Sequence, residues 1–172
     1  MKAIPTVYKV LGIMSGTSLD GIDLAFCRLV FKNGKWKFWL LKNATLPYEK
    51  TWKHKLAFAH ALRGRDLIAL HKEYGRYVGN LVEKFIRTHK ITPHFIASHG
   101  HTIFHDPERK ITFQLGDGSE IAAACRHPVV CDFRSADVAL GGQGAPLVPI
   151  GDELLFPGYD FCLNLGGIGN IS

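Results

Sequence analysis

The sequence predicts an α/β fold with a mixed sheet flanked by helices, and two observations carry that prediction. Residues 7–41 contain three β-type segments in close succession, separated only by short turns. Beyond residue 50, segments with a helical period alternate with short apolar runs typical of strands. Antiparallel strands followed by alternating helices and strands imply a mixed sheet with helices on its faces. The 172 residues, 47% of them hydrophobic, suffice to bury a core.

The three opening strands are expected at residues 7–13, 22–31 and 36–41. Each is rich in β-branched, aromatic or other apolar residues. The sequence Ser15-Gly16-Thr17-Ser18 supplies a turn between the first two strands. Asn33-Gly34 between the second and third strands is the strongest short signal of a hairpin.

A long helix is expected from about Asp66, placed where a cap would help to start it, to about His89. A shorter helix over residues 52–62, ending near Gly64, precedes it. The apolar residues of the long helix recur at spacings of three and four, so they are assigned to the core. They are Leu67, Leu70, Tyr74, Tyr77, Leu81 and Phe85.

The second half of the chain alternates strands with helices and holds most of the glycines. Strands are expected at residues 95–98, 112–115, 129–133 and 161–165, and helices over 120–126 and after Leu147. The strand at 95–98 runs directly into His99-Gly100-His101, so both histidines are expected at its carboxyl end. Ligands of such folds bind beyond the carboxyl ends of the strands.

Charge and cysteine content exclude several classes of protein. Residues 1–95 carry 17 basic and 6 acidic side chains and residues 96–172 carry 4 and 9, but the basic residues are scattered. This favours a solvated basic face over a nucleic-acid site. No apolar run reaches the roughly 18 residues that span a bilayer, and the first residues lack the features of a secretory signal. We therefore expect a cytoplasmic protein with no nucleic-acid or membrane partner and with four reduced cysteines.

The turn between the first two strands is the first candidate site. Residues 12–23 combine the hydroxyls of Ser15, Thr17 and Ser18 with the carboxylates of Asp20 and Asp23. Backbone amides of such turns form concavities that bind anions, and hydroxyls add further donors. The pattern is compatible both with a phosphate site and with an ordinary polar hairpin.

Three histidines form the second candidate site. His99, His101 and His105 have a spacing that allows a zinc site. However, no cysteine or carboxylate completes a zinc motif, and a histidine at a strand end is as often a substrate donor or a packed side chain. No metal ligand is assigned from the residues alone.

A carboxylate close to a glycine-rich loop is the third candidate site. Asp132 and Asp137 follow a predicted strand and precede the loop Gly141-Gly142-Gln143-Gly144. Such a carboxylate suits a general base that takes a proton from water or a hydroxyl. Asp132 could equally cap a helix or turn, with Arg134 as its ion-pair partner. A second glycine turn at Gly166-Gly167 suggests a nucleotide held between two lobes.

Five motifs together resemble one known family, the anhydro-N-acetylmuramic acid kinases, within the superfamily of sugar kinases, actin and heat-shock ATPases. They are GIMSGTSLDGID, ASHGHTIFH, TFQLGDGSEIA, DFRSADVALGGQGAPLVP and LNLGGIGNIS, and they stand in family order over nearly the whole chain. The resemblance implies a mixed five-stranded sheet of the ribonuclease-H type, as in the first lobe of an actin-like sugar kinase. Residues 1–158 would form this lobe, and residues 159–172 would provide the opening strand of a second.

The resemblance also implies an activity. Enzymes of this family use ATP, Mg²⁺ and water to convert 1,6-anhydro-N-acetylmuramic acid into N-acetylmuramate 6-phosphate during cell-wall recycling. By motif, Asp137 would be the catalytic base. The ATP phosphates would lie at Gly16, Thr17, Ser18, Leu19, Asp20, Gly21, Ile22, Asp23, Gly166 and Gly167, and the sugar at Ser98, His99, Arg134, Gly142 and Gln143. The family also suggests a homodimer.

The chain departs from the family and superfamily patterns in three ways. Met14 and Asn164 stand where the superfamily has aspartates associated with magnesium, so we expect the metal to be held through water by Asp20, Asp23 or Asp137. His101 replaces a common glutamine. The family is roughly twice as long, which predicts weak or no kinase activity for these residues alone. Two alternatives stay open: a kinase for another sugar or small acid, and a non-catalytic sugar-binding remnant.

Overall fold

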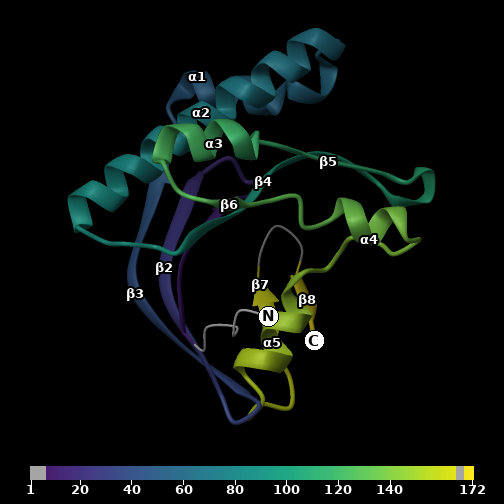
Figure 1. The fold of residues 1–172 in the computed structure, drawn as a ribbon. Coiled ribbons are helices and arrows are strands. Elements are labelled where there is room, and N and C mark those ends of the chain that lie inside the picture. Colours follow the sequence, from purple (N-terminus) through teal and green to yellow (C-terminus); the bar gives the residue numbers. More distant parts are fainter. Residues whose placement is uncertain (1–6, 166–168) are drawn as a thin grey trace, which may run out of the picture.

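The computed structural model describes residues 7–165 and 169–172 and confirms the mixed α/β architecture (Figure 1). Its main sheet has the strand order β3-β2-β1-β4-β5, with β6 also paired to β4. Strands β1 (Val7–Ser15), β2 (Gly21–Lys32) and β3 (Lys35–Pro47) are antiparallel neighbours. Strand β4 (Phe95–Asp106) runs parallel to β1. It pairs antiparallel with β5 (Ile111–Leu115) and parallel with β6 (Val129–Val130).

The helices lie on both sides of this sheet. Helices α1 (Lys50–Ala57), α2 (Gly64–His89) and α3 (Gly118–Cys125) lie together above the strands in Figure 1. The short helix α4 (Ser135–Ala139) lies to the right of the strands in that view, and α5 (Val148–Leu155) lies beside the lower part of β2 and β3. There β7 (Leu163–Leu165) and β8 (Gly169–Ile171) pair as a separate two-stranded sheet. No helix in the described residues is long and apolar enough to cross a membrane.

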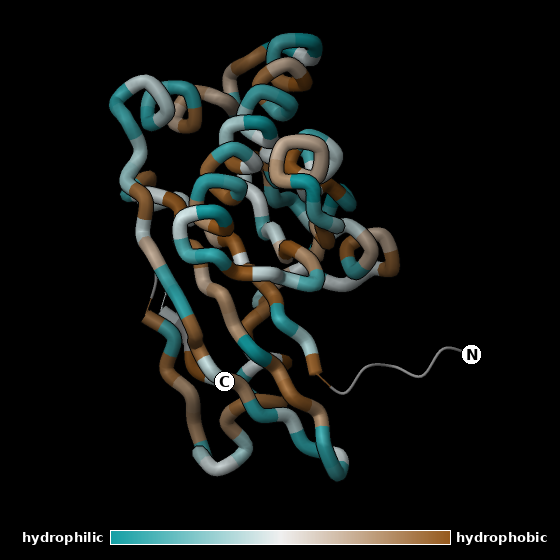
Figure 2. The backbone as a smooth tube through the Cα atoms, turned by 60° about the vertical axis from the view of Figure 1, so that its left-hand side comes forward, coloured by the Kyte–Doolittle hydropathy of each residue, from teal (hydrophilic) through white to brown (hydrophobic). Residues whose placement is uncertain are grey.

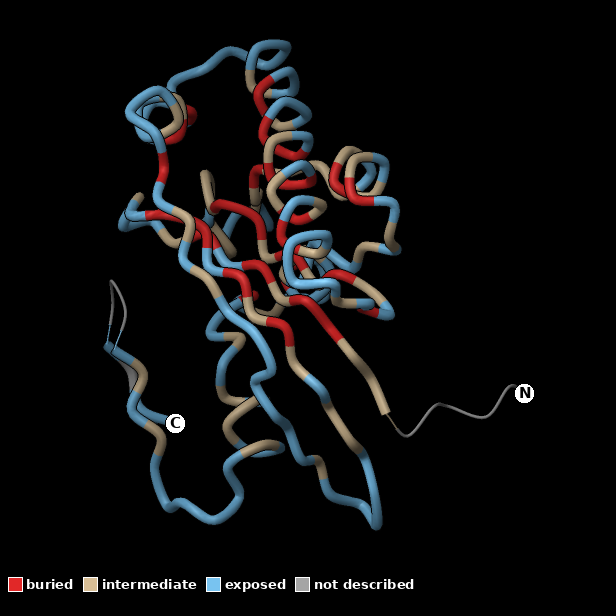
Figure 3. The backbone as a smooth tube through the Cα atoms, turned by 90° about the vertical axis from the view of Figure 1, so that its left-hand side faces the viewer, coloured by how far each residue is buried: buried red, intermediate tan, exposed pale blue. Residues whose placement is uncertain are grey.

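The core lies between α2 and the strands. On β2, Ile22, Leu24 and Phe26 are buried, whereas Asp23 between them is exposed, as the two-residue period of a strand requires. Hydrophobic and hydrophilic residues alternate along α2 (Figure 2), and its buried stripe faces the strands (Figure 3). The deepest side chains of this core are Tyr74, Leu11, Ile22, Leu24, Ile96, Leu115, Ile121 and Val82.

Two glycines let α3 approach α2 closely. A Cβ atom on Gly75 would lie 2.6 Å from the carbonyl oxygen of Asp117, and one on Gly79 would lie 2.6 Å from the Cβ atom of Ala124. Both glycines are buried and lie one turn apart on the same face of α2. Any larger residue at either position would push α3 away from the helix.

Several predicted boundaries were wrong. The long helix begins at Gly64, with Arg63 as its N-cap, and Asp66 lies in its first turn. The short helix ends at Ala57 and is followed by a 3₁₀ turn over Ala59–Ala61. Strand β6 stops at Val130, because Asp132 adopts a left-handed backbone conformation with φ 57°.

The strand that carries the histidines is much longer than predicted. Strand β4 continues past Ser98 as far as Asp106, so His99 and His101 lie within it and not beyond its end. The predicted helix face is displaced as well: Leu70, Tyr74 and Phe85 are buried, but Leu67, Tyr77 and Leu81 are only partly buried. Val78, Val82 and the two glycines, which the spacing argument overlooked, complete the buried face.

Candidate functional site

The turn between β1 and β2 is closed by three local hydrogen bonds. The amide of Leu19 donates to the carbonyl oxygen of Gly16 over 3.3 Å. The hydroxyl of Ser18 and the amide of Gly21 both donate to Oδ1 of Asp20, over 2.8 and 2.9 Å. We call residues 16–20 the phosphate turn, after the role that the sequence predicts for them.

The carboxylate of Asp20 is exposed and stays ionised. The hydrogen bond from Ser18 is the largest cause of its lowered pKa, and the amide of Gly21 acts in the same direction. A bound Mg²⁺–nucleotide needs only one or two protein carboxylates, often through water, so Asp20 fits such a group. No cluster of three or more metal-ligating side chains occurs among the residues that the structure describes.

The other predicted phosphate-site residues are placed differently. Gly21, Ile22 and Asp23 belong to β2, and the side chain of Ile22 is fully buried in the core. Any contact of Ile22 with a nucleotide would therefore involve its backbone. One oxygen of Asp23 accepts a 2.6 Å hydrogen bond from the hydroxyl of Thr45. Gly166 and Gly167 lie outside the described residues.

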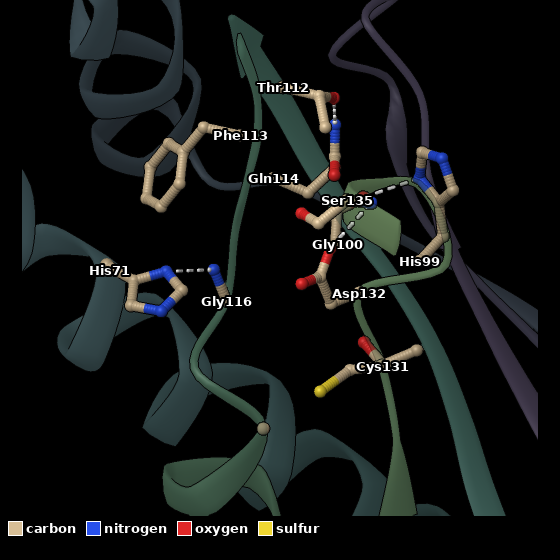
Figure 4. Close-up of a pocket in the computed structure, with 12 residues that line it drawn as sticks. His71, His99, Gly100, Thr112, Phe113, Gln114, Gly116, Cys131, Asp132 and Ser135 are labelled. Atoms are coloured by element: carbon tan, nitrogen blue, oxygen red, sulfur yellow. Dashed lines mark hydrogen bonds between the residues drawn. The ribbon is translucent and has the colours of Figure 1, made fainter. Parts of the chain in front are cut away.

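A pocket of about 190 Å³ lies between the β4–β5 hairpin, the start of α3 and residues 131–135 (Figure 4). Two of the predicted sugar-binding residues, Ser98 and His99, line it. The remaining lining residues bring hydroxyl, amide, imidazole, thiol and carboxylate groups and one aromatic ring. They are His71, Gly100, Thr112, Phe113, Gln114, Gly116, Gly118, Cys131, Asp132 and Ser135. We call this cavity the sugar pocket, because such groups suit the hydroxyls of a sugar.

His99 is held by hydrogen bonds at both ring nitrogens. Arg134 approaches Nε2 through Nε at 3.1 Å and Nη2 at 2.8 Å, and guanidinium groups only donate. Nε2 is therefore the acceptor, and Nδ1–H donates to the carbonyl oxygen of Gly100 over 2.9 Å. Burial is the main cause of the lowered pKa of His99, and Arg134 lowers it further. His99 is accordingly neutral, with its proton on Nδ1.

Arg134 also ties the glycine-rich loop to this histidine. Its Nη1 donates to the carbonyl oxygen of Gly144 over 2.5 Å, while the amide of Gly144 donates to Oδ2 of Asp137 over 2.7 Å. The carbonyl oxygen of the buried Gly144 is thus bound by Arg134, the N-cap of α4, and its amide is bound by Asp137 on α4. A continuous set of hydrogen bonds links the sugar pocket, through His99, Arg134 and Gly144, to Asp137.

Asp137 lies on α4 with an exposed side chain that is packed against a glycine. A Cβ atom on Gly142 would fall 2.3 Å from Oδ2 and 2.4 Å from Oδ1 of Asp137. Only glycine leaves room for the carboxylate in this position. The carboxylate is therefore oriented by the Gly144 amide on one oxygen and kept open to solvent, as a base that activates water requires.

The structure brings together only part of the predicted site. Ser98, His99, Arg134, Gly142 and Asp137 form one hydrogen-bonded or packed group around the sugar pocket and the loop, whereas Gln143 is exposed. Asp132 accepts a 3.3 Å hydrogen bond from the amide of Ser135, so it caps the start of α4. Arg134 contacts His99 and Gly144 instead of forming the alternative ion pair with Asp132.

The three histidines that suggested zinc have separate partners. His99 binds Arg134 and Gly100, His101 Nδ1 lies 3.1 Å from the hydroxyl of Ser15, and His105 Nδ1 lies 3.2 Å from the hydroxyl of Thr112. They converge on no common point that a metal ion could occupy.

Sequence reasoning missed some residues around the sites. His71 accepts a 3.0 Å hydrogen bond from the amide of Gly116 at the wall of the sugar pocket. Tyr48 and Tyr74 form a buried hydrogen-bonded cluster with Ser15 and His101 near the phosphate turn. These partners are separated by 26 to 86 residues in sequence, and no local motif signals such contacts.

Comparison with known proteins gives one family throughout. The family model described as anhydro-N-acetylmuramic acid kinase matches residues 8–172. The anhydro-N-acetylmuramic acid kinase of Pseudoalteromonas translucida is 35% identical over 95% of this chain and 45% of its own length. That of Paramagnetospirillum magneticum is 39% identical over 94% of this chain and 46% of its own length. That of Francisella tularensis subsp. novicida is 38% identical over 93% and 46%.

The chain spans about half the length of the curated relatives that it matches. Within that span, the five motifs, the mixed sheet and the family match agree. The chain belongs to the anhydro-N-acetylmuramic acid kinase family.

Proposed function

We propose that this chain is part of an ATP-dependent kinase that opens the 1,6-anhydro ring of anhydro-N-acetylmuramic acid and phosphorylates the freed O6. Asp137 takes a proton from water as the water oxygen bonds to the anomeric carbon, and the bond from that carbon to O6 breaks. O6 then attacks the γ-phosphorus of ATP in line, and ADP leaves. The product, N-acetylmuramate 6-phosphate, places this reaction in cell-wall recycling.

One observation carries the assignment of the base. The carboxylate of Asp137 accepts a hydrogen bond from the Gly144 amide and sits against Gly142, at a position where no side chain larger than hydrogen fits. The same loop is anchored to His99 of the sugar pocket through Arg134. Substrate position and base orientation are thereby linked, which favours a water held between Asp137 and the anomeric carbon.

The phosphate turn supports the proposed binding of ATP. Its exposed hydroxyls on Thr17 and Ser18 supply donors for phosphate oxygens, and ionised Asp20 would hold Mg²⁺ through water. When bound, Mg²⁺ neutralises charge on the transferring phosphoryl group. Asp23 is already bound to Thr45, so we favour Asp20 over Asp23 as the metal-associated carboxylate.

The test is a turnover assay of the intact kinase that contains these residues, with ATP, Mg²⁺ and the anhydro-sugar in ¹⁸O-labelled water. Label at the anomeric oxygen of the product and none in the phosphate is the expected result. Asp137→Asn should reduce turnover by about 10³-fold or more, since general-base catalysis contributes up to about 10⁴-fold. The matched control is Asp160→Asn, an exposed carboxylate on the loop before β7. Full turnover by Asp137→Asn would overturn the assignment.

A second function, sugar binding without catalysis, is favoured by the position of the sugar pocket. Among the described residues, all of its lining residues lie between His71 and Ser135. Calorimetric titration of the 172 residues with the anhydro-sugar and with ATP separates the two functions. Binding of the sugar alone supports the second one, and product analysis with other sugars tests the choice of substrate.

A further inference from the structure

Four polar side chains form a buried hydrogen-bonded cluster at the end of β1 that precedes the phosphate turn. The hydroxyl of Ser15 lies 2.6 Å from that of Tyr48 and 3.1 Å from Nδ1 of His101. The hydroxyl of Tyr48 lies 2.5 Å from that of Tyr74. All four residues are at most 5% exposed. Buried polar groups stabilise a structure only when each has a hydrogen-bond partner, so the contacts within this cluster fix the relative positions of its four side chains.

A Ser or Tyr hydroxyl donates one proton and can accept two hydrogen bonds. In the order Tyr74 to Tyr48, Tyr48 to Ser15, and Ser15 to Nδ1 of His101, every hydroxyl donates once and Nδ1 accepts. This order predicts the tautomer of His101 that is tested below. Burial lowers the pKa of His101 and raises the pKa of both tyrosines, which keeps every member neutral.

Neutral His101 then carries its proton on Nε2. No side-chain nitrogen or oxygen buried in the described residues lacks a partner, and no protein partner for Nε2 occurs there. Nε2 is therefore the ring atom that keeps access to solvent. The cavity beside it has about 330 Å³ and includes Thr17 and Leu19 of the phosphate turn, together with Leu56, Ala57, His60, Thr102 and Ile103.

Tyr48 contacts both ends of the phosphate turn. Its hydroxyl is hydrogen-bonded to that of Ser15, the residue directly before the turn, and its amide donates to the carbonyl oxygen of Asp20, the last residue of the turn, over 3.4 Å. A single buried residue that follows β3 thus holds the two ends of the turn at a fixed separation.

We propose that Tyr48 is a positioning residue for the phosphate turn, acting through Ser15 and the His101 side chain that Ser15 holds. The inference rests on the proposed function, in which this turn binds the phosphates of ATP. Tyr48 itself touches no ligand. It fixes the spacing of the turn amides, which determines whether they converge on a phosphate oxygen.

The first experiment compares Tyr48→Phe with Tyr77→Phe. Tyr77 lies on α2 and stacks on Trp52 at 4.4 Å, and its hydroxyl has no hydrogen-bond partner among the described residues. Amide hydrogen exchange is measured at Leu19 and Gly21, whose amides close the turn. We expect exchange about tenfold faster in Tyr48→Phe, equivalent to the loss of one hydrogen bond, and no change in Tyr77→Phe. Equal exchange in the two variants overturns the proposal.

Binding of Mg²⁺–ATP by the protein gives the second readout. A Kd raised about tenfold by Tyr48→Phe and by less than twofold by Tyr77→Phe supports the positioning role. If exchange accelerates but wild-type protein does not bind Mg²⁺–ATP, the positioning of the turn stands and its phosphate role fails. The two hypotheses therefore fail in different measurements.

A second pair of variants covers the case in which Tyr48→Phe does not fold. His101→Asn keeps an acceptor near the place of Nδ1, whereas His101→Leu removes it. Exchange at Leu19 should remain slow in the first variant and accelerate in the second. In wild-type protein, ¹⁵N resonances of His101 should show the tautomer protonated at Nε2. The opposite tautomer would refute the proposed hydrogen-bond order. Equal exchange in both His101 variants would refute the positioning role.

Discussion

Replacing Gly142 by alanine should separate the proposed catalytic role of Asp137 from its contribution to stability. The new Cβ atom would lie 2.3 Å from Oδ2 and 2.4 Å from Oδ1 of Asp137. Heavy atoms in contact sit about 3.5 Å apart, so the carboxylate must move by about 1 Å. Gly142 has no positive φ, so alanine brings no backbone strain of its own.

The cost of this displacement should fall on activity and not on folding. Asp137 is exposed, so its carboxylate can swing into solvent and lose only the hydrogen bond from Gly144, worth about 1 kcal/mol or less. A displacement of about 1 Å in a catalytic group typically costs about 100-fold in rate. We therefore expect turnover of the anhydro-sugar to fall about 100-fold while the free energy of unfolding changes by less than about 1 kcal/mol.

The assay follows ADP release by the intact kinase that contains these residues, with saturating ATP, and measures urea unfolding in parallel. The matched control is Gly151→Ala in α5, where a Cβ atom meets nothing within 4 Å and no positive φ is present. The control should retain full turnover. If Gly142→Ala also turned over within twofold of wild type, the carboxylate position that the loop enforces would not matter, and the proposed base would be wrong.

Two further predictions concern stability. Gly79→Ala should lower the free energy of unfolding by about 1–3 kcal/mol, because its Cβ atom would lie 2.6 Å from that of Ala124. Gly64→Ala, whose Cβ atom would meet nothing within 4 Å, should not lower it. Equal urea midpoints for the two variants would contradict the close helix contact. Burial raises the pKa of Asp117, but hydrogen bonds from the first amides of α3 and from Lys72 outweigh it, so the pKa lies below its ordinary value. Ionised Asp117 stabilises the folded protein above about pH 4, and this contribution is lost as pH falls through the folded-state pKa. In Asp117→Asn, the free energy of unfolding measured in urea should therefore fall less steeply between about pH 5 and pH 3 than in wild type. An unchanged slope would contradict this.

The sequence predicts the parts of the fold that depend on local patterns. The three opening strands and the long helix are confirmed, because hydrophobic periodicity and the Asn33-Gly34 signal act over a few residues. The close approach of α3 to α2 was not predicted, because glycines such as Gly75 and Gly79 only indicate low helix propensity until their partners in α3 are known. The displacement of the buried helix face toward Val78 has the same origin.

The candidate site, like the fold, could be predicted only where a local motif carries the signal. Motifs predict roles for Asp137, Ser98 and His99, but they do not predict that Arg134 binds His99 and Gly144 instead of Asp132. Those contacts depend on how α4 returns to β4, which no local pattern encodes. The roles that the motifs assign to all of these site residues, and to Gln143, Gly166 and Gly167, stay predictions.

The least predictable feature is the separation of His99 from His101. Residues two apart on a regular strand share a face, yet His99 lines the sugar pocket while His101 binds Ser15. The cause is a bulge. Ile13 pairs with Ser98 and Ser15 pairs with His101, so two residues of β4 stand opposite Met14 alone. Gly100 occupies this bulge with φ 74°, and a Cβ atom there would lie 2.7 Å from the carbonyl oxygen of Leu115.

Gly100→Ala and Gly34→Ala test whether the bulge requires glycine for space as well as for conformation. Gly34 has nearly the same φ, 75°, but nothing lies within 4 Å of its Cβ position. Gly34→Ala should therefore cost only the left-handed strain of about 1 kcal/mol. Gly100→Ala adds a clash with a backbone atom that no side-chain rotation relieves, for a total of about 3 kcal/mol. The difference in urea unfolding free energy isolates the clash. Equal costs would mean that the bulge tolerates a side chain, and the separation of the two histidines would need another cause.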